Sequence, residues 1–188
     1  IIMGCSTSTS STKALVDYVD PNIGTAHCRW FFYTPAAIPF GMAKLAPSTD
    51  GIWEIPVVGK QWGMIFVNFH RSFANFHEFQ VGGVVFAPTV GELQTVPGEL
   101  ENPDGGYRSR FDKKDEVAAP GYYSVLLKDY GVKAELTAMK RVGFHRYTYP
   151  KTELANLIFD IGNKQEESGE VKDAEVQYFS KMAGWKVM

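Results

Sequence analysis

The sequence predicts an all-β protein, an antiparallel β-sandwich, and three observations support this fold class. Short runs in which apolar and polar residues alternate fill the second half of the chain, and Gly, Pro, Asn or Asp separates them. Helical periodicity of 3.6 residues nowhere persists for more than about two turns. Aromatic residues make up 14% of the 188 residues, which is typical of strands that pack against one another.

Composition and charge exclude several classes of protein. The chain is 45% hydrophobic and 21% charged, with a net charge of −2, as in globular proteins. It has no Lys/Arg run that would neutralise phosphates, so nucleic acid is not an expected partner. No segment reaches the ~18 apolar residues that span a bilayer. We expect one domain over residues 15–188, incomplete at its C-terminus.

The first 14 residues are interpreted as the remnant of a lipoprotein signal and a Ser/Thr-rich tether. Cys5 follows "IIMG" and precedes "STSTSST". A short apolar run, a small residue, a cysteine and a polar tether resemble a bacterial lipoprotein signal, in which the cysteine carries the lipid. Met3 is larger than usual at its position, so a chance cysteine in a disordered tail is the alternative. We therefore expect a lipid anchor at Cys5, as the sole membrane contact, in the bacterial periplasm or on the outer-membrane surface.

The first half of the chain predicts strands broken by turns. "LVDYVDPNIGT" predicts a short strand that ends in a turn. "FFYTPAAIPFGMAKLAPS" contains three prolines, which exclude a regular helix and indicate a loop leading into a short strand around residues 42–45. "VGGVVFAPTVGELQTV" predicts a strand, a break at its proline and a second strand.

The second half gives the clearest pattern. "ENPDGGYRSRF" predicts an Asp-Gly turn followed by alternating residues. Strands are predicted over 122–128 and 132–140, with a turn at 129–131 between them. In the second of these strands Val132, Ala134, Leu136 and Ala138 share one face, and Lys133, Glu135 and Thr137 share the other. "VGFHRYTYP" and "ANLIFDIG" predict two more strands.

Three stretches together carry a family resemblance. They are "VDYVDPNIGT", "TPAAIPFGMAKLAPST" and "APGYYSVLLKDYGVKAELTAMKRVGFHRYTYP", in this order and at this spacing. They resemble the N-terminal domain of glycoside hydrolase family 92, the calcium-dependent exo-α-mannosidases. The resemblance covers roughly residues 15–178, apart from residues 51–72.

The resemblance implies a two-part enzyme with its active site between the parts. A β-sandwich packs on a larger C-terminal (α/α) helical barrel. Family members invert the anomeric carbon: a carboxylic acid protonates the leaving oxygen, and a carboxylate base activates a water molecule. The two groups stand far enough apart to admit that water. Calcium contacts the mannose hydroxyls. The carboxylates and calcium ligands belong to the C-terminal domain. This chain is therefore expected to be inactive alone and to bind no calcium itself. Its expected partners are that domain and α-mannoside glycans.

The resemblance also implies which residues shape the sugar pocket. The matching stretches are "AHCRWFFYTP" and "FANFHEFQVGG". His27 and Arg29 would donate hydrogen bonds to sugar hydroxyls, Trp30 would stack on a pyranose ring, and His77 and Glu78 lie in the second stretch. The alternative is that the aromatic residues pack the end of the sandwich and the histidines are structural.

Other polar residues are interpreted as structural. Asp112 and Asp115 in "FDKKDE" are typical of a charged surface turn, and His145 in "GFHRY" is interpreted as a structural side chain. Cys28 has no obvious partner for a disulfide.

Residues 51–72 are apolar without a period, unlike their neighbours. Many relatives carry a Gly/Trp-rich loop here. Synonymous codons for residues 51–67, read one base later, can yield "HLGNPSGWEAVGYDFR", and codons for residues 68–72, shifted the other way, can give "TSIE". The ending "YFSKMAGWKVM" is reread as "QDGRVEGY", a strand-turn-strand that the given ending is expected to lack. We hypothesise that 51–72 and 179–188 are frame-shifted, with a divergent insertion as the alternative. A shifted frame predicts an exposed apolar patch and poor solubility.

The leading interpretation is thus a truncated N-terminal domain of a secreted α-mannosidase. Two alternatives remain: a stand-alone carbohydrate-binding module that uses Trp30, and a non-functional gene remnant.

Overall fold

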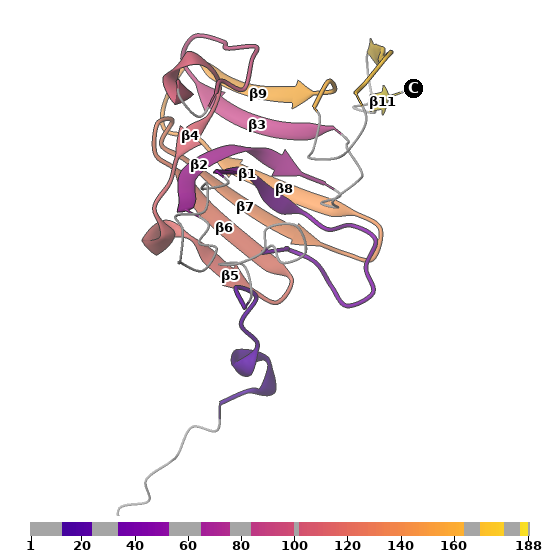
Figure 1. The fold of residues 1–188 in the computed structure, drawn as a ribbon. Coiled ribbons are helices and arrows are strands. Elements are labelled where there is room, and N and C mark those ends of the chain that lie inside the picture. Colours follow the sequence, from indigo (N-terminus) through magenta and orange to yellow (C-terminus); the bar gives the residue numbers. More distant parts are fainter. Residues whose placement is uncertain are drawn as a thin grey trace, which may run out of the picture.

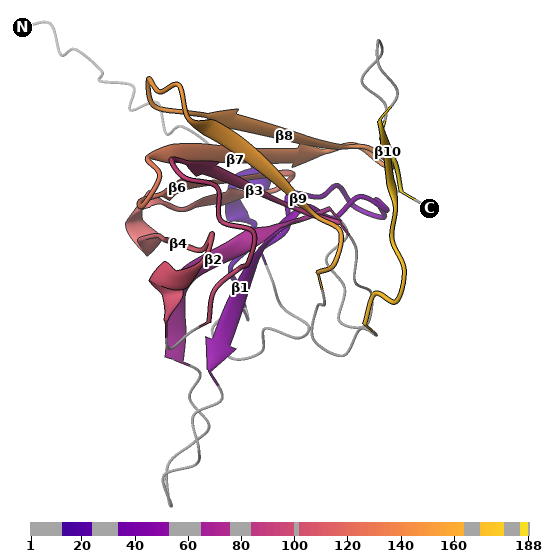
Figure 2. The ribbon, with the colours of Figure 1, turned by 90° about the horizontal axis from the view of Figure 1, so that it is seen from above.

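The computed structural model describes residues 13–23, 34–52, 65–75, 84–99, 102–163, 170–178 and 185–187. Over these residues the chain forms two antiparallel sheets in two layers and a separate two-stranded ribbon, without an α-helix, so the predicted β-sandwich is confirmed (Figures 1 and 2). Three short 3-10 helices connect the strands: η1 (Leu15–Tyr18), η2 (Pro103–Gly105) and η3 (Lys113–Asp115).

One layer is a four-stranded meander in the order β5-β6-β7-β8. Its strands are β5 (Val117–Ala119), β6 (Tyr122–Leu127), β7 (Val132–Ala138) and β8 (Gly143–Thr148). Gly121 and Gly131 occupy the two turns on either side of β6 with φ of 75° and 63°, a conformation that favours glycine. The strands predicted over 122–128 and 132–140 are confirmed to within two residues at each end.

The other layer joins the two halves of the sequence. Its strands are β1 (Ala46–Ile52), β2 (Ile65–Ala74), β3 (Val85–Val90) and β9 (Ala155–Asp160), in the order β1-β2-β3-β9, and β4 (Ser109–Arg110) also pairs with β2. The pairing of β3 with β9 runs over six residues on each strand. This ladder places "ANLIFDIG" beside "VVFAPTV", as Figure 1 shows near the top of the molecule.

The core lies between the two layers because each contributes one apolar face. The alternation in β7 buries Val132, Ala134 and Leu136, and Leu45 and Phe73 come from the opposite layer. A Val, Leu or Phe side chain contributes about 1.5–3 kcal/mol when it is fully buried. The predicted inward face of β7 is therefore confirmed.

Residues 96–99 and 102–109 are bonded to one another and to strand β9. Tyr107 is 2% exposed, and its hydroxyl donates to Asp160 of β9 at 2.7 Å. The Arg108 guanidinium donates to the carbonyl oxygens of Pro97 and Gly98, at 2.8–3.1 Å. The hydrogen bond of Tyr107 thus attaches this segment to the sheet, and the hydrogen bonds of Arg108 join its two ends.

Gly106→Ala is expected to detach this segment. A Cβ atom at Gly106 would lie 2.1 Å from the Gly98 nitrogen and 2.5 Å from the Val96 oxygen, so backbone would have to move. We expect a loss of about 2–3 kcal/mol in the free energy of unfolding, measured by urea denaturation.

The matched control for this substitution is Gly162→Ala, where the nearest atom would be 3.7 Å away. Equal stabilities of the two variants would contradict the close approach.

The start of the chain differs from its prediction. The expected short strand is wrong, because residues 15–18 form the 3-10 helix η1. An isolated strand leaves its backbone groups without partners, whereas in η1 the Val19 amide donates to the Val16 carbonyl at 3.2 Å. The strand expected around 42–45 begins later, at Ala46, and Leu45 makes only an isolated bridge with Ala36.

The expected break at Pro88 is also wrong. Pro88 lies inside β3, and no second strand follows among the described residues 91–99. Strand β2 pairs only with Val85 and Phe86 of β3, so no β2 partner requires an amide proton from Pro88. A proline is tolerated where one side of a strand is unpaired.

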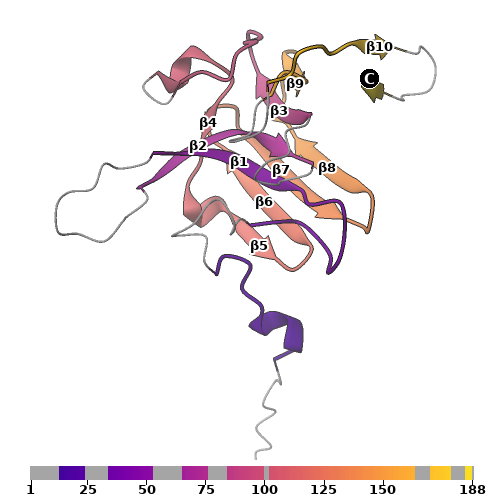
Figure 3. The same ribbon diagram turned by 45° about the vertical axis from the view of Figure 1, so that its right-hand side comes forward.

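Two parts of the suspected frame-shifted regions are regular strands. Residues 65–72 belong to β2, and Gly51 and Ile52 of β1 pair with Phe66 and Ile65 (Figure 3). Residues 53–64 lie outside the described residues. The ending does contain two paired strands, contrary to expectation, because β10 (Val176–Tyr178) pairs antiparallel with β11 (Trp185–Val187). The frame shift itself stays a hypothesis that sequencing of the gene tests: an intact frame without an insertion or deletion would end it.

Candidate functional site

The predicted site residues lie outside the described residues. His27, Arg29 and Trp30 fall within 24–33, His77 and Glu78 within 76–83, and Cys5 within 1–12. What the structure does describe is the chain on either side of the two predicted sugar-binding segments. The site is therefore built from the points at which those segments are attached.

These attachment points are hydrogen-bonded neighbours at one end of the sandwich. The Ala36 amide donates to the Leu45 carbonyl at 2.8 Å, and the Lys44 amide donates to the Asn75 carbonyl at 3.2 Å. The Asn75 side-chain amide in turn donates to the Val84 carbonyl at 2.9 Å. Chain that leaves segment 24–33 thus lies next to chain that enters and leaves segment 76–83. We call these five residues the anchored end.

A half-buried polar relay fixes Asn75 to the opposite sheet. Nε2 of His145 on β8 lies 2.7 Å from the Asn75 side-chain oxygen, and Nδ1 lies 2.8 Å from the Tyr147 hydroxyl. Asn75 uses its NH₂ group on Val84, so its oxygen accepts from Nε2–H, and Nδ1 of the neutral ring accepts from Tyr147. Burial lowers the pKa of His145 to about 4, so the ring is neutral at neutral pH.

Aromatic rings surround the relay and restrict its movement. The rings of Phe86 and His145 meet edge to face at 5.1 Å, and Phe86 meets Phe159 in the same way at 4.9 Å. Phe73 contacts Tyr147 at 5.8 Å. His145 is therefore a positioning side chain between the sheets, in agreement with its interpretation as structural.

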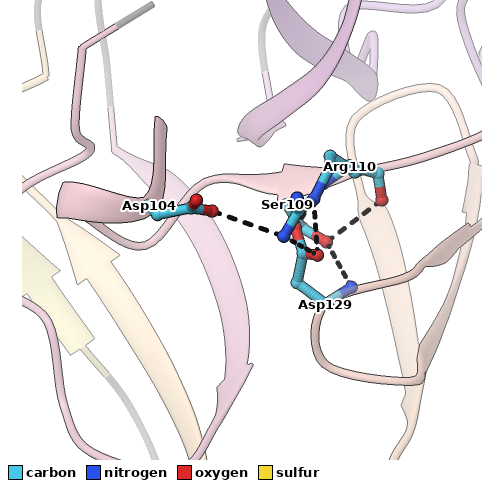
Figure 4. Close-up of polar contacts among 4 residues, drawn as sticks. All are labelled: Asp104, Ser109, Arg110 and Asp129. Atoms are coloured by element: carbon cyan, nitrogen blue, oxygen red, sulfur yellow. Dashed lines mark hydrogen bonds and ion pairs between the residues drawn. The ribbon is translucent and has the colours of Figure 1, made fainter. Parts of the chain in front are cut away.

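A second polar cluster lies on the Asp129-Tyr130-Gly131 turn, at the other end of β7 (Figure 4). The guanidinium and backbone amide of Arg110 both donate to the Asp129 carboxylate, each at 2.7 Å, and Asp104 lies 3.3 Å from the same guanidinium. The Asp129 amide donates to the Ser109 hydroxyl at 3.2 Å. The hydrogen bond that Arg110 donates to Asp129 raises the pKa of Arg110. One cation pairs with both carboxylates, and its bonds to Asp129 link β4 to the turn.

Glu135 is the most strongly perturbed carboxylate of the described chain. Arg146 donates two hydrogen bonds to its carboxylate, each at 2.7 Å, and the Tyr122 hydroxyl donates a third at 2.7 Å. The Arg146 bonds, followed by the Tyr122 bond, lower the pKa of Glu135 to about 2. A carboxylate that stays ionised at neutral pH has no proton to donate, so Glu135 is not a general acid.

The charged turn around residue 112 occurs as predicted. Asp112 precedes η3, and its carboxylate pairs with Lys128 and with Lys114. The hydrogen bond from Lys128 lowers the pKa of Asp112. Asp115 ends η3, away from the anchored end in sequence, and no chemistry is assigned to either residue.

The described residues contain no group of three or more His, Cys, Asp or Glu that could hold a metal ion. In the same part of the chain, no helix is long and apolar enough to cross a membrane.

The family assignment follows from a match over nearly the whole chain. The family model described as Glycosyl hydrolase family 92 N-terminal domain matches residues 18–186. The chain belongs to glycosyl hydrolase family 92. No curated protein matches it.

Solved structures of family 92 enzymes share this fold. The alpha-mannosidase BT3965 from Bacteroides thetaiotaomicron, in complex with mannoimidazole, is 34% identical with a TM-score of 0.66, over 80% of this chain and 20% of its own. The inverting mannosidase BT2199 from the same organism is 25% identical with a TM-score of 0.60, over 79% and 20%. This family 92 domain thus spans about a fifth of the length of the solved relatives.

Proposed function

We propose that this domain shapes the sugar pocket of a secreted α-mannosidase that acts on mannose-containing glycans. The observation that carries the proposal is the anchored end, where the two predicted sugar-binding segments are attached side by side. Two segments that start from neighbouring points, held by a half-buried relay, would bring their polar and aromatic side chains to one place. The mannoimidazole bound by the relative BT3965 supports a mannose-like ligand.

Each residue of the proposed pocket has a binding role. His27 and Arg29 would donate to sugar hydroxyls, Trp30 would offer a flat apolar face, and His77 and Glu78 would fix the ring from the second segment. Inverting hydrolysis needs two carboxyl groups far enough apart to admit a water molecule. We assign those groups, and the oxygen ligands of calcium, to polypeptide beyond this domain. Bound calcium would supply a hard cation for the mannose hydroxyls.

A chimera tests this function. This chain replaces the N-terminal domain of BT3965, and mannose release from an α-mannoside is measured with and without calcium. We expect an active, calcium-dependent chimera in which Trp30→Ala and His77→Ala each lower kcat/KM by about 10–100-fold, because a lost binding contact costs roughly 1.5–3 kcal/mol. Leu154→Ala, at an exposed turn, is the control and keeps full activity.

Two results would contradict the proposal. Full activity of both pocket variants would exclude the pocket-shaping role. An inactive chimera, combined with α-mannoside binding by the 188-residue chain alone, would favour a stand-alone carbohydrate-binding module.

We also propose that Cys5 carries a lipid that holds the protein at the bacterial periplasmic or outer-membrane surface. The Ser/Thr-rich run that follows Cys5 would act as the tether. Radiolabelled palmitate should enter the protein in cells and should not enter Cys5→Ser; equal labelling of both would refute the anchor.

A further inference from the structure

Two turns at the anchored end present large apolar side chains to solvent. Phe40 is 100% exposed, Met42 61%, Met139 62% and Val142 51%. The Met42 amide donates to the Lys140 carbonyl at 2.7 Å, so the turn at 38–42 is bonded to the β7–β8 hairpin. The two turns lie side by side in Figures 1 and 3. We call these four side chains the apolar platform.

Phe40 is fully exposed and has a strained backbone conformation. Among the described residues, Phe40 is the one non-glycine with a positive φ, at 58°. That conformation costs a bulky L-residue roughly 1–2 kcal/mol. Phe40 is 100% exposed, so no packing against the described residues offsets this cost. Within this domain alone the arrangement is unfavourable, which indicates that another surface covers Phe40.

The charges around the platform point to the chemistry of that surface. Residues 34–48 and 138–144 contain Lys44, Lys140 and Arg141 and no Asp or Glu, although the whole chain has a net charge of −2. Lys140 and Arg141 are exposed at the tip of the hairpin. A complementary surface would offer an apolar hollow to Phe40 and acidic side chains to the two cations.

The location identifies the occupant. The 38–42 turn connects Ala36 to Lys44 and Leu45, so the platform adjoins the anchored end and the proposed pocket. The solved relatives carry about four-fifths of their length beyond the part that this chain covers. A pocket completed by that polypeptide requires contact close to the pocket.

We propose that the apolar platform is the surface on which the rest of the family 92 polypeptide docks, with Phe40 in an apolar hollow that has an acidic rim. This inference rests on the proposed function, because it assigns the docking partner of the same site. The experiments below also allow two other outcomes: a second copy of the chain covers the apolar platform, or the platform stays exposed to solvent.

Hydroxyl-radical footprinting compares the 188-residue chain with the BT3965 chimera. We expect oxidation of Phe40, Met42 and Met139 to fall by about tenfold in the chimera, because interface cores pack as densely as protein interiors. Leu154 is the internal control: it is 61% exposed and lies beyond the opposite end of β8, so its rate should not change. Protection already present in the chain alone, together with a dimeric mass, would assign the platform to a second copy and overturn the proposal.

Phe40→Gly separates docking from folding. Glycine accepts the positive φ and removes an exposed ring, so the melting temperature of the chain alone should rise by about 2 °C. In the chimera the same substitution should remove the protection of Met42 and Met139, whereas Leu154→Gly should leave it intact. Protection that survives Phe40→Gly would contradict the role of Phe40.

Mannose release by the same chimera distinguishes the two proposals. An active chimera with an unprotected platform overturns the docking surface and leaves the proposed function standing. A protected but inactive chimera supports the docking surface and counts against the function. An unprotected and inactive chimera overturns both.

Discussion

Phe73→Ala is expected to lower the free energy of unfolding by about 3–5 kcal/mol, the range for removing a buried aromatic ring. Phe73 has no exposed surface and belongs to the core cluster. It packs on Tyr147, which hydrogen-bonds His145 of the relay. The cavity would therefore loosen the attachment of segment 76–83 as well as the core. Urea denaturation followed by tryptophan fluorescence measures the loss.

Phe144→Ala is the matched control for this prediction. Phe144 lies on β8 with 49% of its surface exposed, so its truncation should cost below about 1 kcal/mol. A loss for Phe73→Ala as small as that for Phe144→Ala would show that the two layers do not pack as described.

Acid is expected to destabilise the domain through His145. Its pKa is about 4 in the folded chain, against an ordinary value of 6.5, so the unfolded chain takes up the proton first as the pH falls. Stability from this group is complete above pH 6.5, declines below it and is lost once the pH falls through about 4. The expected loss is about 3 kcal/mol, because each pKa unit corresponds to 1.36 kcal/mol.

His145→Gln should remove this pH dependence between pH 6.5 and 4, because glutamine does not titrate. Glu135, whose pKa is lowered to about 2, contributes stability that is lost as the pH falls from about 4.5 through 2, so the two windows overlap only between about pH 4.5 and 4. Urea midpoints measured at several pH values test the assignment. A wild-type curve that is flat from pH 7 to 4 would contradict the half-buried, neutral relay.

The meander β5-β6-β7-β8 was predictable because its evidence is local. Alternation places Val132, Ala134 and Leu136 on one face, and glycines such as Gly131 mark the turns. The failures occur where distant pairing decides. Pro88 is tolerated because β2 pairs with only two residues of β3, and residues 65–72 form a strand because β1 lies alongside. Neither partner is visible in the local sequence.

The candidate site was predictable only in part, for the same reason. The aromatic and polar character of the two segments is a property of their sequence, and the family resemblance located them. The relay joins Asn75 and His145, which lie 70 positions apart in the sequence, so no local pattern reveals their contact. His145, which alternates with Phe144 in a predicted strand, was the one available signal, and it was interpreted as a structural side chain.

The central claim is that this domain shapes a mannose pocket without supplying the reacting groups. The most direct test is mannose release from an α-mannoside by the purified 188-residue chain, with calcium and with a chelator. We predict no release above that of buffer in either condition. Calcium-dependent release of mannose by this chain alone would contradict the account.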